Sequence, residues 1–221
     1  MKTQSCTNPS LARQAILAHS FAGAEPQMGS VQNFVQDREI FAQGAAAEYF
    51  YKVVSGVVRT CKFLVDGRRQ IDAFHVAGDI FGLEPGAERP LSAEAVCDCT
   101  VIAYRKNRLD GMAVHDKNLS WELLSFAMSG MEQAREHSFL LGRRSAVEKV
   151  AGFLLAWAEK SQRDSMISLA MSRQDIADYL GLTIETVSRT LSQLERDNVI
   201  DLPSVRQIHV LNLELLEDLA A

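Results

Sequence analysis

The sequence predicts an α+β protein in which an N-terminal β-barrel is followed by a long helix and a small helical C-terminal domain. Three observations support this class. Between residues 31 and 104, short segments rich in β-branched and aromatic residues alternate with glycines, a pattern typical of an all-β barrel or sandwich. Residues 118–142 contain no proline and carry apolar residues at helical spacing. Residues 172–198 carry the start and stop signals of two short helices.

Length and composition are those of an ordinary globular protein. The 221 residues are enough for one or two domains, and 47% hydrophobic with 23% charged residues exclude a mainly disordered or fibrous chain. The formal charge of −5 argues against binding of nucleic acid through overall basicity, but not against a local DNA site. No apolar run approaches the roughly 20 residues of a membrane span, and residues 1–30 lack a secretory signal. We therefore expect a cytoplasmic protein with no membrane partner.

The barrel is predicted over residues 31–112, after an N-terminal extension at residues 1–30. Asp66-Gly67 predicts a tight hairpin turn within it, because this dipeptide readily adopts positive φ. The expected strands are residues 49–54, 57–65, 69–75 and 95–104.

Four cysteines are present, Cys6, Cys61, Cys97 and Cys99. Without a secretory signal we expect reduced thiols. Cys97 and Cys99 would face the same side of one predicted strand, which leaves a redox pair or a metal site open. We favour the interpretation that both cysteines act only as small apolar residues of the core or surface. We predict no metal and no cofactor.

Residues 113–143 are predicted to form a dimerisation helix. Its apolar residues cover more than one stripe, whereas a helix that packs on a single core needs only one. We therefore expect a homodimer, and the alternative is a helix buried within one chain. One stripe has the 4-3-4-3-4 spacing of a coiled-coil seam: Leu123, Ala127, Gly130, Ala134, His137 and Leu141.

The domain predicted over residues 144–221 contains a helix pair of the helix-turn-helix type. Ser172 and Asp175 form a capping-box-like start, and Gly181 ends the first helix. Thr183 caps the second helix. Because the turn between them is short, the two helices must cross steeply.

The second helix of this pair predicts contact with DNA bases. An arginine can donate two hydrogen bonds to guanine, a carboxylate can accept one from cytosine, and serine can contact several bases. The alternative is a solvated helical hairpin with no ligand. Residues 199–211 favour the DNA-binding interpretation. Their apolar residues alternate as in the β-hairpin of a winged helix, and Arg206 could reach a phosphate. The outer face of the helix carries Glu185, Ser188, Arg189 and Ser192.

The charge of the C-terminal region limits nonspecific binding. Residues 143–221 hold nine Lys or Arg against twelve Asp or Glu. We therefore expect weak affinity for random DNA, with binding that depends on dimerisation, a few phosphate contacts and helix N-termini.

Two blocks of the sequence carry specific motifs. They are Gly44…Phe50-Tyr51-x-Val53-x-x-Gly56-x-Val58 with Gly78-Asp79-x-Phe81-Gly82-Leu83, and Arg173-Gln174-Asp175-Ile176-Ala177-Asp178-Tyr179-Leu180-Gly181-Leu182-Thr183-x-Glu185-Thr186-x-Ser188-Arg189. Both blocks resemble the CRP/FNR superfamily of transcription regulators, and the second is similar to its FixK branch. The resemblance covers nearly all of the chain after residue 30. It implies a cyclic-nucleotide-binding-like barrel of the jelly-roll type, a dimerisation helix and a winged helix-turn-helix.

The resemblance also implies a function. A homodimer would bind a TTGA-N6-TCAA-type palindrome, mainly as an activator working with RNA polymerase, in microaerobic or nitrogen-fixation-type gene control. Base reading would fall on Glu185, Ser188 and Arg189. Ile184 stands where the cyclic AMP receptors have arginine, which favours TTGA over TGTGA half-sites. Backbone or supporting contacts are expected from Ser172, Arg173, Thr183, Ile184, Thr186, Ser192 and Arg206.

Departures from the family pattern argue against its known effectors. Glu88-Arg89-Pro90 stands where the cyclic AMP receptors hold the cyclic phosphate with an Arg-Ser pair, and proline has no donor to offer. Only Cys6 lies in the N-terminal region, so we expect no iron–sulfur cluster. Ser172 stands where some FixK proteins have a cysteine, which excludes a thiol switch at that position.

Two other functions are alternatives. The first is an effector-gated regulator that binds a small molecule in the barrel. The second is an enzyme, which we do not expect, because the sequence has no nucleotide-binding glycine loop, no metal-ligand spacing and no nucleophile motif.

Overall fold

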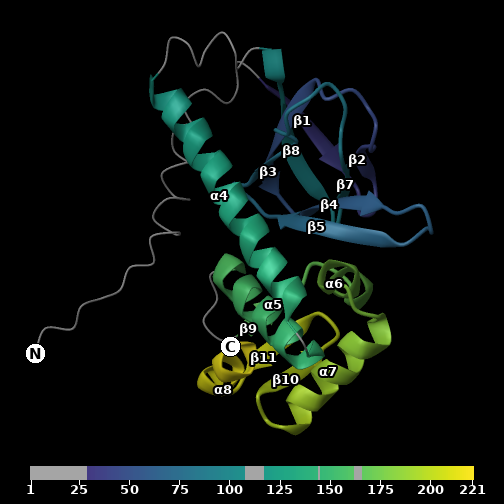
Figure 1. The fold of residues 1–221 in the computed structure, drawn as a ribbon, viewed down its shortest axis with the longest axis vertical. Helices are drawn as coiled ribbons and strands as arrows, with labels where there is room; N and C mark the ends of the chain where they lie inside the picture. The colour runs from purple at the N-terminus through teal and green to yellow at the C-terminus, as the bar shows by residue number, and fades with distance from the viewer. Residues whose placement is uncertain (1–28, 108–116, 144, 162–165) are drawn as a thin grey trace, which may run out of the picture.

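The computed structural model describes residues 29–107, 117–143, 145–161 and 166–221, and it has two parts connected by one long helix (Figure 1). The N-terminal part consists of strands, and the C-terminal part is mainly helical. The predicted α+β class, with a barrel before a helical domain, is confirmed.

The barrel is made of two four-stranded antiparallel sheets. Their strand orders are β1-β8-β3-β6 and β2-β7-β4-β5. Apolar side chains fill the space between them, with Val53, Val58 and Val101 completely buried. The strands are β1 (Gly29–Phe34), β2 (Glu39–Phe41), β3 (Tyr49–Ser55), β4 (Val58–Phe63), β5 (Arg69–His75), β6 (Ile80–Phe81), β7 (Ser92–Ala95) and β8 (Cys99–Arg105).

A tight turn connects β4 and β5, as predicted. The backbone N–H of Leu64 donates to the carbonyl of Arg68 at 2.8 Å, and that of Gly67 donates to Leu64 at 2.9 Å. Gly67 has φ +84°, a conformation that strains residues with a Cβ. The Asp-Gly hairpin is therefore confirmed.

The single strand predicted over residues 95–104 is wrong. β7 ends at Ala95 and β8 begins at Cys99, and the two strands belong to different sheets. The chain changes sheets at this corner, which an alternating pattern of residues does not reveal. Cys97 therefore lies before the strand that Cys99 begins, and the two thiols do not share a strand face. Burial raises the pKa of the Cys99 thiol to about 11, which favours an unreactive thiol.

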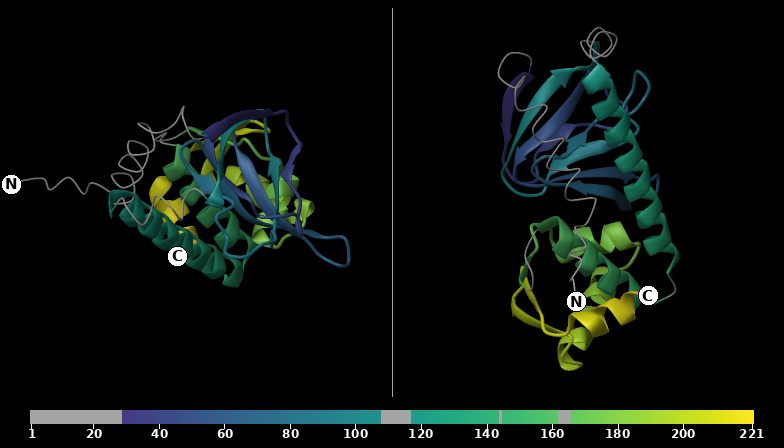
Figure 2. Two further views of the ribbon diagram at one scale, coloured as in Figure 1. Left: turned by 90° about the horizontal axis from the view of Figure 1, so that it is seen from above. Right: turned by 90° about the vertical axis from the view of Figure 1, so that its left-hand side faces the viewer.

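The long helix is α4 (Lys117–Gly142), which confirms the helix predicted over residues 118–142. It runs along the outside of the barrel and reaches the C-terminal part (Figures 1 and 2). Within the described part of the chain, no helix is long and apolar enough to cross a bilayer.

The C-terminal part combines five further elements with the predicted wing. β10 and β11 form the predicted hairpin, and β9 pairs with β11 to make a small antiparallel sheet. The elements are α5 (Ala146–Ser161), β9 (Met166–Ser168), α6 (Arg173–Leu180), α7 (Ile184–Arg196), β10 (Ile200–Ser204), β11 (Gln207–Val210) and α8 (Leu213–Ala220).

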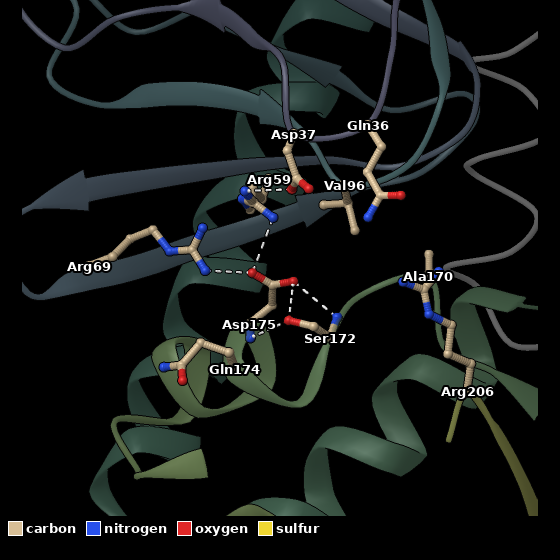
Figure 3. A pocket seen from close by; sticks show the side chains of 10 residues that line it. All are labelled: Gln36, Asp37, Arg59, Arg69, Val96, Ala170, Ser172, Gln174, Asp175 and Arg206. Carbon is tan, nitrogen blue, oxygen red and sulfur yellow. Dashed lines mark hydrogen bonds and ion pairs between the residues drawn. The ribbon is translucent and has the colours of Figure 1, made fainter. Parts of the chain in front are cut away.

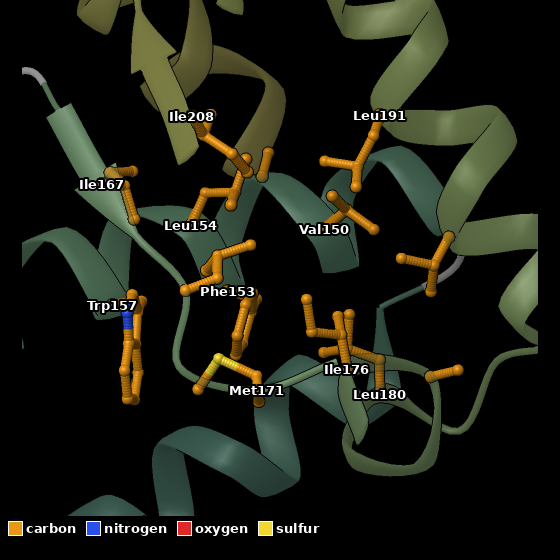
Figure 4. Packing of buried hydrophobic residues seen from close by; sticks show 14 of the residues in the cluster. Val150, Phe153, Leu154, Trp157, Ile167, Met171, Ile176, Leu180, Leu191 and Ile208 are labelled. Carbon is orange, nitrogen blue, oxygen red and sulfur yellow. The ribbon is translucent and has the colours of Figure 1, made fainter. Parts of the chain in front are cut away.

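The C-terminal core is centred on α5 (Figure 4). The same cluster of buried residues continues into the barrel. Leu154 of α5, Ile176 of α6 and Leu191 of α7 lie in one buried cluster. Phe74 of β5 belongs to the same cluster, and its ring meets that of Trp157 edge-on, with 6.0 Å between centroids. The two parts of the molecule therefore share apolar contacts.

Candidate nucleic-acid interface

The first helix of the helix-turn-helix, α6, begins and ends as the sequence predicts. Ser172 Oγ accepts from the backbone N–H of Asp175 at 3.1 Å, and Asp175 Oδ2 accepts from that of Ser172 at 3.0 Å. Gly181 ends the helix in the left-handed region, with φ 63°, and its N–H donates to Ala177. These bonds satisfy donors and acceptors that a helix end leaves without partners.

The second helix, α7, is anchored by its inner face. Thr183 Oγ1 accepts from the backbone N–H of Thr186 at 3.2 Å, which confirms the predicted N-cap. Val187, Leu191 and Leu194 are all buried, as their helical spacing predicts. The inner face fixes α7 on the core, so the opposite face is free to meet a ligand.

The three predicted base-reading residues lie on that opposite face. Glu185 and Arg189 are exposed, and Ser188 is half-buried. Hydrogen bonds from its own backbone N–H and from Thr183, together with the charge of Arg189, lower the pKa of Glu185. Glu185 is therefore ionised near neutral pH and can act only as an acceptor.

The supporting residues have different surroundings. Thr183 and Thr186 are engaged in the cap of α7, with 3.0 Å between their hydroxyl oxygens. Ile184 is exposed and Ser192 half-buried. Arg173 opens α6, and its Nε is buried without a hydrogen-bond partner among the described residues. The expected DNA contacts of this group stay predictions.

Arg206 lies in the turn between β10 and β11 and is exposed. Its backbone carbonyl accepts a hydrogen bond from the N–H of Leu169 at 2.8 Å. This bond ties the turn of the wing to the segment that follows β9. The same arginine borders a pocket between the barrel and the start of α6, together with Ser172 (Figure 3). Its predicted contact with a phosphate stays a prediction.

Sequence reasoning missed Arg59 of β4 and Arg69 of β5. Both lie in the barrel, and both pair with Asp175 of α6 at the domain boundary. Arg69 also pairs with Asp178. More than a hundred residues separate these partners, so no local pattern could have shown the contact. Two of the acidic residues that make the C-terminal region negative are thus neutralised by the barrel.

Only part of the predicted dimer seam lies on the solvent-exposed side of α4. Ala127, Gly130 and Ala134 are exposed. Leu141 is half-buried, and it is the nearest neighbour of the space beside Gly181 in its own chain. The side chain of Leu123 lies outside the described residues.

His137, the remaining position of that seam, also faces its own chain. Its ring stacks on Tyr179 of α6, with 3.9 Å between centroids and an angle of 2°. Large apolar side chains are exposed on another side of α4 instead. They are Trp121 (68% exposed), Leu124 (49%), Met128 (61%), Met131 (66%) and Phe139 (71%).

In the barrel, Arg89 is buried and already engaged by the protein. Its guanidinium donates to the carbonyls of Gly82, at 2.8 Å, and Tyr49. The same group lies 4.0 Å from the centre of the Phe41 ring, a cation–π contact. An anion at this position would have to compete with these bonds.

Two family models match the chain. Residues 31–116 match the cyclic nucleotide-binding domain, and residues 148–219 match the Crp-like helix-turn-helix domain. The predicted domain limits at residues 30, 112 and 143 stay predictions, and residue 112 lies outside the described part.

Similar proteins include two nitrogen fixation regulation proteins FixK. The one from Azorhizobium caulinodans is 46% identical over 82% of this chain and 75% of its own length. The one from Rhizobium meliloti is 39% identical over 89% of this chain and 91% of its own length. The solved structure of FixK2 from Bradyrhizobium japonicum superposes with a TM-score of 0.83, at 42% identity, over 87% of this chain and 98% of that one.

Proposed function

Because this chain belongs to the FixK-type branch of the CRP/FNR superfamily of transcription regulators, we propose that its homodimer reads a TTGA-N6-TCAA-type palindrome through α7. The geometry of α7 carries the proposal. The helix is capped at Thr183 and anchored by buried apolar residues, and Glu185, Ser188 and Arg189 lie opposite near its N-terminus. In a helix-turn-helix, the N-terminal residues of the second helix meet base edges in the major groove.

The chemistry of these side chains fits a TTGA half-site. Arg189 can donate two hydrogen bonds to O6 and N7 of the guanine. Glu185, kept ionised, can accept from N4 of the cytosine paired with that guanine or of a neighbour. The two side chains are one helical turn apart and can support one another.

The exposed face of α4 supports a homodimer. Trp121, Leu124, Met128 and Met131 repeat at the 3-4-3 spacing of a coiled-coil seam, and all are exposed. A stripe of large apolar residues on the surface is typical of a protein–protein contact. We therefore centre the dimer contact on these four residues, which we call the α4 stripe. Ala127 and Ala134 stay in the proposal as flanking residues that let a second helix approach.

A dimer also explains how a region with excess negative charge can bind DNA. Two α7 helices related by a two-fold axis meet two half-sites about one turn of DNA apart. The free energies of binding to the two half-sites then add, so tight binding does not need a chain with net positive charge. We propose that the bound dimer acts mainly as an activator through RNA polymerase, in the cytoplasm. Nitrogen fixation genes are the proposed targets, by analogy with the names of the relatives.

Selection of bound sequences from a random DNA pool tests the proposed site. We expect enrichment of TTGA and TCAA half-sites separated by six base pairs. Enrichment of TGTGA half-sites would contradict the choice of TTGA, which rests on Ile184. Enrichment of no palindrome would contradict the assignment of Glu185, Ser188 and Arg189.

Cyclic AMP is expected to leave the affinity for this palindrome unchanged. Arg89 is bonded to backbone carbonyls, and Pro90 has no N–H to donate to a cyclic phosphate. The measurement is a DNA titration with and without cyclic AMP. A large gain in affinity would instead favour the effector-gated regulator.

Replacing Arg206 by alanine is expected to weaken binding to all DNA sequences alike. A wing arginine that contacts phosphate carries no sequence information. Its loss lowers the slope of log affinity against log salt concentration by about one unit per chain, or about two for the dimer. The measurement is a titration of palindromic and random DNA at several salt concentrations. Arg68→Ala, which removes another exposed arginine, from the barrel hairpin, is the control. A loss confined to the palindrome would assign Arg206 to base reading.

A further inference from the structure

Two arginines of the barrel hold the first helix of the helix-turn-helix (Figure 3). Arg69 Nη2 lies 2.5 Å from Asp175 Oδ1, and Arg69 Nε donates to Asp178 Oδ2 at 2.8 Å. Arg59 Nη1 donates to Asp175 Oδ1 at 3.1 Å, and Arg59 Nε donates to Glu94 Oε2 at 2.8 Å. We call these five residues the interdomain clamp.

The interdomain clamp is largely removed from water. The side chains of Arg59 and Asp175 are 7% and 6% exposed, and that of Arg69 is 18% exposed. Asp175 and Glu94 each pair with both arginines, and Arg59 also pairs with the exposed Asp37. Loss of either arginine therefore leaves a single guanidinium between two carboxylates that are largely shielded from water, which weakens the contact. Burial by itself would lower the pKa of Arg69, but hydrogen bonds and attraction from Asp178 and Asp175 outweigh it and raise that pKa.

Asp175 links the N-terminal cap of α6 to the barrel through its two carboxylate oxygens. Oδ2 accepts from Ser172 in the cap of α6, while Oδ1 accepts from the barrel arginines. The other end of α6 is held too, because Gln70 Nε2 donates to the carbonyl of Tyr179 at 3.4 Å and the Tyr179 ring packs on Phe74, with 5.3 Å between centroids. With both ends attached to β5, α6 cannot rotate freely against the barrel.

The orientation of α6 decides that of α7. Only residues 181–183 separate the two helices, and their buried residues share one core. The barrel in turn packs along α4, which carries the proposed dimer contact. The direction in which α7 points from the dimer axis is therefore fixed where α6 meets the barrel.

We propose that Arg59 and Arg69 are specificity-determining residues that set the spacing between the two half-sites without touching DNA. The inference rests on the proposed homodimer and palindrome. Each added base pair moves the second half-site by about 3.4 Å and turns it by about 35°. A dimer whose α7 helices are held rigidly cannot follow this change, whereas a dimer with loosened helices can.

The similarity to the solved FixK2 structure supports a defined arrangement of the two domains. One superposition with a TM-score of 0.83 covers 87% of this chain, so it includes both the barrel and the helix-turn-helix. The overall arrangement of the two domains is therefore similar in that structure.

The experiment compares the full chain with Arg59→Gln, Arg69→Gln and the matched control Arg68→Gln. Arg68 is the neighbour of Arg69, but its side chain is 76% exposed and pairs with Asp66 in the hairpin turn. Each protein is titrated with palindromes of five, six and seven spacer base pairs and with a single half-site. Each is also used to select DNA from a random pool.

For Arg59→Gln and Arg69→Gln, we expect the preference for the best spacer over its neighbours to fall at least about fivefold, the lower range of measured coupling between sites. Affinity for the single half-site should stay within about twofold, and Arg68→Gln should keep the full preference. An unchanged spacer preference in both variants overturns the inference. An equal loss on the single half-site and on every palindrome also overturns it, because that result means general damage to α7.

Asp178→Asn keeps the test decisive if an arginine variant does not fold. This change removes one contact of Arg69 and leaves the α6 cap intact. A folded Asp178→Asn protein, checked by its melting temperature, should show the same broadened spacing, and unchanged spacing refutes the proposal. The half-site sequence that the unmodified chain selects tests the base-reading assignment separately, since the spacing can be compared whatever that sequence is.

Discussion

Replacing Arg189 by alanine is expected to lower affinity for the TTGA-N6-TCAA palindrome by about 30-fold to about 20,000-fold. A bidentate contact between arginine and guanine contributes roughly 1–3 kcal/mol of discrimination, and a dimer loses two such contacts. Arg189 is exposed on the outer face of α7, and the helix stays anchored by Val187 and Leu191. The loss should therefore come from DNA contact and not from unfolding.

A comparison of two DNA sites shows whether Arg189 reads a base. The variant and the unmodified chain are titrated with the palindrome and with a version whose G·C pairs are changed. The unmodified chain should lose affinity on the changed site, and Arg189→Ala should bind both sites about equally. If Arg189→Ala loses as much on the changed site as on the palindrome, Arg189 is a phosphate contact. Arg196→Ala, two turns further along the same helix, is the control and should affect both sites weakly and alike.

Introducing aspartate at Met128 and Met131 is expected to convert the dimer into monomers. Burial of a methionine side chain contributes about 1.5–3 kcal/mol, so four buried methionines contribute at least about 6 kcal/mol to the dimer. The substitution also brings like charges together across the seam. Sedimentation equilibrium should show the mass of one chain, and binding to the palindrome should fall toward that of a single half-site. A variant that remains a dimer would show that the α4 stripe is not the contact.

A second pair of substitutions separates the α4 stripe from the seam predicted by spacing alone. Gly130 and Ala134 are exposed but lie to one side of the stripe, so Gly130→Asp with Ala134→Asp should weaken the dimer less. If this pair dissociates the dimer and the methionine pair does not, the small-residue seam is the correct one.

Local signals in the sequence determined much of this protein. The capping of α6 by Ser172 and Asp175, the left-handed Gly181 and the Asp-Gly turn at Gly67 all depend on residues a few positions apart. The same holds for the inner face of α7, because helical periodicity separates buried from exposed positions within one turn. Hydrogen bonds and steric limits of this range act before the chain has folded, so a pattern of residue types predicts them.

Contacts between distant segments were decided only by the tertiary structure. Where the chain leaves one sheet for the other, after Ala95, depends on closure of the barrel and not on residue alternation. Which stripe of α4 is open depends on where α6 docks, since Tyr179 covers the His137 side. The pairing of Arg59 and Arg69 with Asp175 joins residues more than a hundred positions apart. An arginine in a strand has the same sequence signature whether it faces water or a carboxylate of another domain, and only the packing of the two domains distinguishes these cases.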